Sequence, residues 1–155
     1  MKPTETDYAW AAGIIDGEGC IAMTRAKVGV NRRKTESFQV RISVRMTHGD
    51  TIRRLHELFG GTFKRARSRD PLRHKSTFEW FVGDLATETT LRLVTPFLIT
   101  KRSQAELVLK YRAECCPPIN GGICAPVLVQ RRRRDFDRLP SLNNKGPTPW
   151  GGMLA

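Results

Sequence analysis

The sequence predicts an α+β fold with the element order αββαββα, in which helices cover one face of a four-stranded antiparallel sheet. Residues 38–46 alternate apolar and polar side chains without a break, which is the period of a strand with one buried face. Along the chain, the patterns follow one another as helix, two strands, helix, two strands and further helices. No internal repeat interrupts this order, so we expect a single domain.

The opening helix is predicted over about Tyr8 to Ile15, with an acidic turn after it. Ala9, Gly13 and Gly17 are spaced four residues apart, so they share a helical face that carries almost no side chain. Glycine costs about 1 kcal/mol relative to alanine inside a helix, so this face indicates that a second backbone approaches closely. An ordinary buried helix with a glycine-rich end explains the same spacing equally well.

The rest of the chain supplies the sheet and the covering helices. Strands are expected at 20–27, 38–46, 62–69 and 77–82, and helices at 51–59, 83–94, 103–114 and 127–139. Asp50 is expected to cap the helix over 51–59, and Gly60 and Gly61 to end it. The domain is predicted to cover residues 1–139, and residues 140–155, rich in Gly, Pro and Asn, to form an irregular tail.

The composition restricts the class of partner. The chain has 155 residues and a net charge of +12, which predicts binding to an anionic polymer or membrane surface and favours nucleic acid. No apolar run reaches the roughly 18 residues of a membrane-spanning helix. The polar N-terminus resembles neither a secretory signal nor a transit peptide. The four cysteines lack the spacing of disulfides or zinc ligands, so we expect an intracellular protein.

The polar positions of the strand over 38–46 carry no acid, which favours a surface that faces DNA over a merely solvated one. Arg can contact guanine, and Gln adenine, through paired hydrogen bonds in the major groove. The candidate base contacts are Thr24, Gln39, Arg41, Ser43, Arg45, Lys64 and, more weakly supported, Glu79. The candidate contacts to phosphate, or further along the groove, are Arg25, Lys27, Arg32, Arg33, Lys34, Arg65, Arg67 and Arg69.

Two segments resemble a known family. Residues 11–19, AAGIIDGEG, resemble the signature of the LAGLIDADG homing endonucleases, although Ala11 and Ile14 replace leucines and Glu18 replaces the last aspartate. Residues 96–105, PFLITKRSQA, resemble the segment that supplies this family's active-site lysine. The resemblance covers about Tyr8 to Leu139. It implies an αββαββα fold whose sheet saddles double-stranded DNA. Because the sequence has one motif, it implies a homodimer that makes a metal-dependent double-strand cut in a long, roughly palindromic target.

The resemblance also assigns roles to residues. Glu18 is implied as the catalytic carboxylate and metal ligand, with the Gly17 carbonyl as a further ligand. Lys101 is implied beside the scissile phosphate, where it would stabilise negative charge or tune the attacking water. Mg²⁺ is the expected cation, with Mn²⁺ or Ca²⁺ binding at the same site. The residues implied at the dimer interface are Ala9, Ala12, Gly13 and Asp16, with Asp16 capping the partner helix or its own turn.

One departure from the family pattern leaves other functions open. Many relatives carry a polar residue, often Gln, at the end of the second strand, and strand parity assigns that position to Met46, with Arg45 or Thr47 as substitutes. Reduced or absent cleavage is therefore an alternative, in a non-cleaving DNA-binding protein. A second alternative is an intron RNA maturase or splicing cofactor. Exposed aromatic residues, on which RNA bases can stack, would support this alternative, and the predicted sheet face has Phe81.

Overall fold

The computed structural model describes residues 2–26, 36–66, 75–115 and 126–143. The elements are, in order, α1 (Glu5–Glu18), β1 (Gly19–Ala26), β2 (Ser37–Met46), α2 (Gly49–Phe59), β3 (Thr62–Ala66), β4 (Thr77–Gly83), α3 (Asp84–Val94), η2 (Thr95–Phe97), α4 (Arg102–Cys115) and α5 (Pro126–Asn143). This order confirms the α+β prediction.

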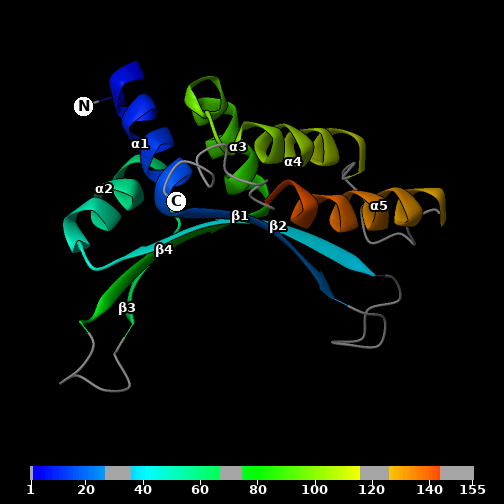
Figure 1. Ribbon diagram of the computed structural model, residues 1–155, viewed down its shortest axis with the longest axis horizontal. Helices are drawn as coiled ribbons and strands as arrows, with labels where there is room; N and C mark the ends of the chain where they lie inside the picture. The colour runs from blue at the N-terminus through cyan, green and yellow to red at the C-terminus, as the bar shows by residue number, and fades with distance from the viewer. Residues whose placement is uncertain (1, 27–35, 67–74, 116–125, 144–155) are drawn as a thin grey trace, which may run out of the picture.

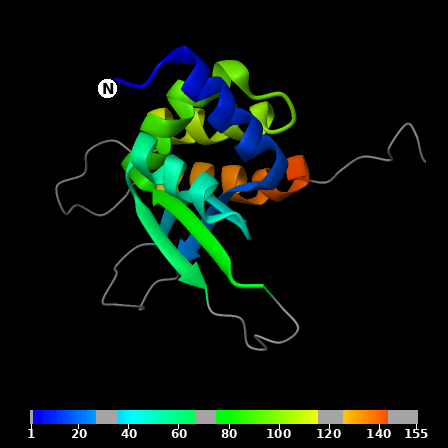
Figure 2. The same ribbon diagram turned by 90° about the vertical axis from the view of Figure 1, so that its left-hand side faces the viewer.

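The four strands form one antiparallel sheet in the order β1-β2-β4-β3. Helices α1 to α5 all lie on one side of this sheet, and no described element covers the other side (Figures 1 and 2). The strands bend beneath the helices, as the right-handed twist of sheets requires, so the uncovered side is a long curved surface. We call this side the open face.

The helix α1 begins at a capping box, in which Thr4 and Asp7 each accept a hydrogen bond from the backbone of the other. It runs to Glu18, and β1 begins at the next residue. The expected turn at Asp16 to Glu18 is therefore wrong, because these residues form the last helical turn. The direct change to a strand depends on Gly19, where a Cβ atom would lie 2.6 Å from the Ile15 carbonyl oxygen.

The core lies between the sheet and the helices, and β2 supplies much of it. Val40, Ile42 and Val44 are buried, as the alternation predicts. Trp80 on the neighbouring strand β4 is also fully buried, and its indole Nε1 donates a hydrogen bond to the Gly60 carbonyl oxygen at 2.8 Å. This bond satisfies the one polar atom of the buried ring and ties β4 to the end of α2.

The ends of α2 differ partly from expectation. His48, and not Asp50, is the N-cap, because the His48 Nδ1 accepts from the Thr51 amide at 3.3 Å. Asp50 lies in the first turn of the helix, where its charge suits the positive end of the helix dipole. Gly60 ends the helix as predicted, with a φ of 66°. Gly61 is required by space, since a Cβ there would lie 2.5 Å from the Phe81 carbonyl oxygen.

The last helix extends beyond the predicted domain boundary. α5 continues through Pro140 to Asn143, so the irregular tail does not begin at residue 140. Tertiary contacts outweigh the helix-breaking tendency of proline here. Leu139 is buried in the core, Leu142 packs against it, and Gln104 donates a hydrogen bond to the Leu142 carbonyl oxygen at 2.9 Å. Among the described helices, none is long and apolar enough to cross a bilayer.

Candidate active site and nucleic-acid interface

The last turn of α1 meets the segment that leads into α4. The carboxylate of Asp16 accepts hydrogen bonds from three consecutive backbone amides, those of Ile99 at 2.6 Å, Thr100 at 3.3 Å and Lys101 at 2.9 Å. Burial favours the neutral acid, but these hydrogen bonds outweigh it and hold the pKa of Asp16 below its ordinary value. Asp16 therefore caps a segment of its own chain.

The same contact places Lys101 at the end of α1. Its Nζ donates to the Asp16 backbone carbonyl oxygen, so the side chain lies along the last helical turn. The two segments that carried the family resemblance are far apart in sequence and adjacent in space. An ammonium group has three donors, so Lys101 keeps further donors for a ligand beside Glu18.

Glu18 contrasts with Asp16, although it lies on the same turn. Its side chain is exposed, and it forms no hydrogen bond or ion pair with the described residues. Gly17 is also exposed, and its carbonyl belongs to the last turn, where the helix provides no amide partner. A free carboxylate and a free carbonyl are hard oxygen ligands that suit Mg²⁺ or Ca²⁺. Within the described residues, no group of three acidic, His or Cys side chains gathers to complete such a site.

The face of small residues on α1 is uncovered. Ala9, Gly13 and Gly17 are exposed, and a Cβ added at Gly13 or Gly17 would meet no described atom within 4 Å. The assignment of Ala12 to this face is wrong. Ala12 is fully buried against the chain's own core, because it lies one residue, a rotation of about 100°, from Gly13 and on the side of the buried Ile15.

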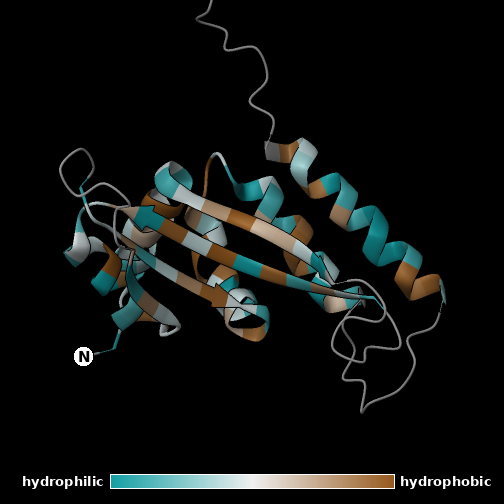
Figure 3. Cartoon of the chain, turned by 90° about the horizontal axis from the view of Figure 1, so that it is seen from below, coloured by the Kyte–Doolittle hydropathy of each residue, from teal (hydrophilic) through white to brown (hydrophobic). Residues whose placement is uncertain are grey.

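The open face carries the polar side chains of the sheet, and Figure 3 shows the alternation of hydrophilic and hydrophobic residues along its strands. Thr24 on β1 lies directly opposite Gln39 on β2, and both are exposed. Arg45 and Lys64 are exposed, while Arg41 and Ser43 are half-buried. The candidate base contacts on β1, β2 and β3 therefore share one surface, and their roles in binding stay predictions.

Glu79 lies at the centre of this surface and is buried, with 6% of its area exposed. One carboxylate oxygen lies 3.0 Å from Arg41 Nη2, and the other lies 3.3 Å from Arg45 Nη2 and 2.9 Å from Lys64 Nζ. Burial favours the neutral acid, but hydrogen bonds from Lys64 and Arg45 outweigh it and lower the pKa of Glu79. Its oxygens already have three basic partners, and its role as a direct base contact stays a prediction.

Phe81 forms the floor beneath two of these cations. The Arg41 guanidinium lies 3.9 Å from the centre of the ring, and the Lys64 ammonium lies 5.2 Å from it. The register of the strands brings these side chains together. Glu79 on β4 lies opposite Arg45 of β2 on one side and opposite Lys64 of β3 on the other. The sequence pattern gave the parity of each strand but not their pairing, so it missed this cluster.

Two predicted contacts lie on the other face of the sheet. Arg25 has the same parity as Ile21 and Met23, and it pairs with Glu36 on the helix side. Arg65 has the parity of Phe63, and its Nη2 donates to the Ser76 hydroxyl at 3.1 Å. Strand parity thus removes both from the open face. The remaining predicted contacts lie outside the described residues: Lys27, Arg32, Arg33, Lys34, Arg67 and Arg69.

The position expected to hold a polar residue at the end of β2 was also misassigned. Met46 lies on the helix side of the sheet and packs against the core, opposite Phe78. Gly19 pairs with Val44, so the residues one step beyond this pair are Glu18 and Arg45. The open-face residue nearest in register to the motif acid is therefore Arg45.

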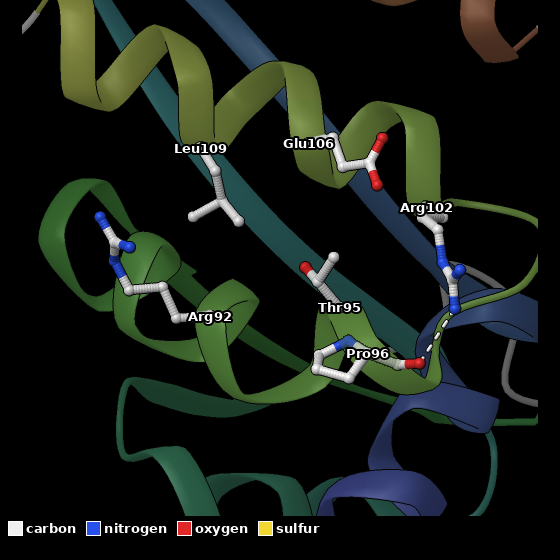
Figure 4. Close-up of a pocket in the computed structure, with 6 residues that line it drawn as sticks. All are labelled: Arg92, Thr95, Pro96, Arg102, Glu106 and Leu109. Atoms are coloured by element: carbon white, nitrogen blue, oxygen red, sulfur yellow. Dashed lines mark hydrogen bonds between the residues drawn. The ribbon is translucent and has the colours of Figure 1, made fainter.

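A groove of about 440 Å³ lies on the helix side, between α3, η2 and α4 (Figure 4). Its two arginines already have partners: Arg92 pairs with Glu88, and Arg102 donates to the backbone oxygens of Pro96 and Leu98. The groove includes neither Glu18 nor any open-face residue. It is therefore separate from the candidate site.

Comparisons with known proteins agree with this geometry. No family model matches the sequence. The chain is 30% identical over 120 residues to the DNA endonuclease I-CvuI of Chlorella vulgaris, covering 71% of this chain and 68% of that protein. It also matches a crystal structure of I-CvuI in complex with its target in the presence of Ca, with a TM-score of 0.72, 23% identity, and coverage of 93% of this chain and 85% of that one.

Two other solved structures share the fold. The archaeal intron-encoded homing endonuclease I-Vdi141I, complexed with DNA, matches with a TM-score of 0.70 and 15% identity over 94% of this chain and 89% of that one. I-SmaMI, bound to an uncleaved DNA target, matches with a TM-score of 0.56 and 21% identity over 92% of this chain but 46% of that chain. The chain belongs to the LAGLIDADG family of homing endonucleases, and its sequence carries one copy of the family motif.

Proposed function

We propose that this protein is a site-specific DNA endonuclease that makes a metal-dependent double-strand cut in a long, roughly palindromic target as a homodimer. The observation that carries the proposal is the last turn of α1, where Glu18 is free and exposed and Asp16, two residues earlier, holds Lys101. Family membership supports the class of activity, and the basic open face supports DNA as the substrate.

The residues supply distinct parts of the chemistry. A divalent cation at Glu18 and the Gly17 carbonyl would acidify a water molecule and neutralise charge on the scissile phosphate. Lys101, with its backbone amide and Nζ both bonded to Asp16, would present its remaining donors to the phosphate oxygens. Asp16 fixes the position of Lys101 and is a positioning residue.

The homodimer rests on the uncovered small-residue face. Gly13 has open space on its outer side, and I-SmaMI, which this chain covers over 46% of its length, has room for two units of this size. If two α1 helices pack through Gly13, the two Glu18 side chains lie on either side of a twofold axis. Each protomer would then place its open face on half of the target.

The test of the endonuclease is cleavage of a randomised duplex library in Mg²⁺, with an EDTA control and sequencing of the cut ends. We expect cutting at a long, near-palindromic site. Glu18→Gln should reduce the rate by more than about 100-fold, the upper range for residues that only support a metal ligand, while the target is still bound. Glu57→Gln is the matched control, because Glu57 is an exposed acid on α2. Loss of binding by Glu18→Gln would instead make Glu18 structural.

The test of the dimer is Gly13→Leu. Because a Cβ atom at residue 13 would meet no described atom of its own chain within 4 Å, the substitution should not disturb the monomer and should raise helix stability by about 1 kcal/mol. Dimerisation should be lost, as measured by sedimentation velocity. Arg53→Leu, at an exposed position on α2, controls for added apolar surface. A Gly13→Leu dimer of unchanged affinity would exclude this face as the interface.

These tests also separate the alternatives. A protein that recovers a preferred duplex but never cuts it is a DNA-binding protein. A protein with no preferred duplex would favour structured RNA. The open face argues against RNA, because Phe81 is covered by Arg41 and Lys64 and is not free to stack on a base.

A further inference from the structure

We propose that Glu79 is a positioning residue that holds Arg41 and Arg45 together as a unit for recognition of guanine in neighbouring base pairs of each half-site. This inference rests on the proposed function, since it concerns the DNA that the open face would contact. It adds the base preference of the site and the residue that produces it.

The first observation is that the side chains of Arg41 and Arg45 converge on Glu79. Arg41 and Arg45 are four residues apart on one strand, so their Cα atoms are separated by about 13 Å, which corresponds to about four base pairs. Their guanidinium groups nevertheless meet at one carboxylate, with Nη2 to oxygen distances of 3.0 and 3.3 Å. The arginines therefore present their ends to a short stretch of DNA.

The second observation is the restricted geometry of Arg41. Its Nε is buried and has no hydrogen-bond partner, and its guanidinium carbon lies 3.9 Å from the centre of the Phe81 ring. Only the terminal nitrogens can reach a ligand, and each keeps a free N–H. An end-on pair of N–H donors matches the O6 and N7 acceptors of guanine in the major groove.

The third observation is charge. Three cations lie side by side on this surface, and without a carboxylate among them they would repel one another and spread apart. Glu79 is buried, so it can hold all three without reaching the DNA itself. Its removal should leave the positive charge but allow the arginines to separate and change conformation, which weakens base preference more than general affinity.

The experiment selects bound duplexes from a randomised library in Ca²⁺, so that the result does not depend on cutting. Wild type should recover guanine at neighbouring positions in each half-site. Glu79→Gln, which keeps the side-chain volume, should lower that guanine preference by about tenfold. Arg41→Lys and Arg45→Lys keep the charge but lose the two-pronged geometry, so each should lose guanine at its own position with little change in salt dependence.

The control is Glu36→Gln. Glu36 is a buried carboxylate that also pairs with two arginines, Arg25 and Arg133, but on the helix side of the sheet. Its substitution should leave every base preference unchanged. Urea unfolding of each variant separates a lost preference from a lost fold.

Each remaining result has one meaning. An unchanged guanine preference in folded Glu79→Gln would overturn the inference. A preference lost only at a base pair that Arg41→Lys and Arg45→Lys leave unchanged would also overturn it, because Glu79 would then be a base contact itself. Wild type that cuts a site without neighbouring guanines would overturn the inference and leave the endonuclease intact. Selective binding of guanine without cutting in Mg²⁺ would overturn the endonuclease and leave the inference intact.

Discussion

The two faces of the sheet use alternate residues of the same strands for different purposes. On the helix side of β2, Val40, Ile42 and Val44 are buried and make the core. On the open face, Gln39 and Arg45 are exposed. Neighbouring residues in one strand therefore differ in whether they belong to the core or to the surface that we propose binds DNA. A single substitution should affect one property and leave the other unchanged.

The two faces also have a feature in common, since each has a buried carboxylate that pairs with more than one basic side chain. On the helix side, Glu36 forms ion pairs with Arg25 and with Arg133 of α5, whose Nε lies 2.7 Å from the Glu36 Oε2. These pairs join the sheet to the last helix. On the open face, Glu79 forms ion pairs with Arg41, Arg45 and Lys64, all of which belong to strands of the sheet. The first cluster links elements of the fold, whereas the second arranges a surface.

The largest contrast should come from Ile42→Ala. Ile42 is fully buried, so its truncation leaves a cavity and should lower the free energy of unfolding by about 2–5 kcal/mol. Urea denaturation measures this loss. DNA affinity of the fraction that remains folded should match wild type. A selective loss of affinity with an unchanged unfolding midpoint would break the division between the faces.

The opposite contrast should come from Gln39→Ala, three residues earlier on the same strand. Its side chain is exposed, so the free energy of unfolding should change by less than about 0.5 kcal/mol. If Gln39 contacts adenine, the substitution should remove about 1–3 kcal/mol of discrimination at one base pair of each half-site. Competition binding with single-base variants of the selected target measures this, and Thr51→Ala on α2 serves as a control distant from the open face.

The smallest effect should be the dependence of stability on pH. Hydrogen bonds from Arg133 and Arg25 lower the pKa of Glu36 from its ordinary 4.5 to about 2. Because the folded pKa lies below the unfolded one, this carboxylate stabilises the fold above about pH 4.5, and the contribution is lost as the pH falls toward 2. Unfolding midpoints at neutral and acidic pH should therefore converge for wild type and Glu36→Gln as the pH falls. A difference between the two unfolding midpoints that stays constant with pH would contradict a stabilising role for the ion pairs of Glu36.

Local patterns predicted the strands and their faces because the alternation in β2 records which side is buried. They could not predict that β2 pairs with β4, since that pairing joins distant segments, and the Glu79 cluster depends on it. Parity alone could have placed Arg25 and Met46 on the helix side, where the structure has them. The extension of α5 past Pro140 was not predictable, because contacts of Leu139 and Leu142 with the core outweigh the local effect of proline.

The hydrogen bonds of Asp16 have a consequence for redesign. They fasten the entrance of α4 to the last turn of α1, so Lys101 is held to the helix that carries Gly13 and Glu18. The strands that present Arg41, Arg45 and Lys64 contribute no side chain to these bonds. If the open face reads DNA as we propose, substitutions that retarget it should leave the proposed catalytic groups in place, provided that Asp16 is kept.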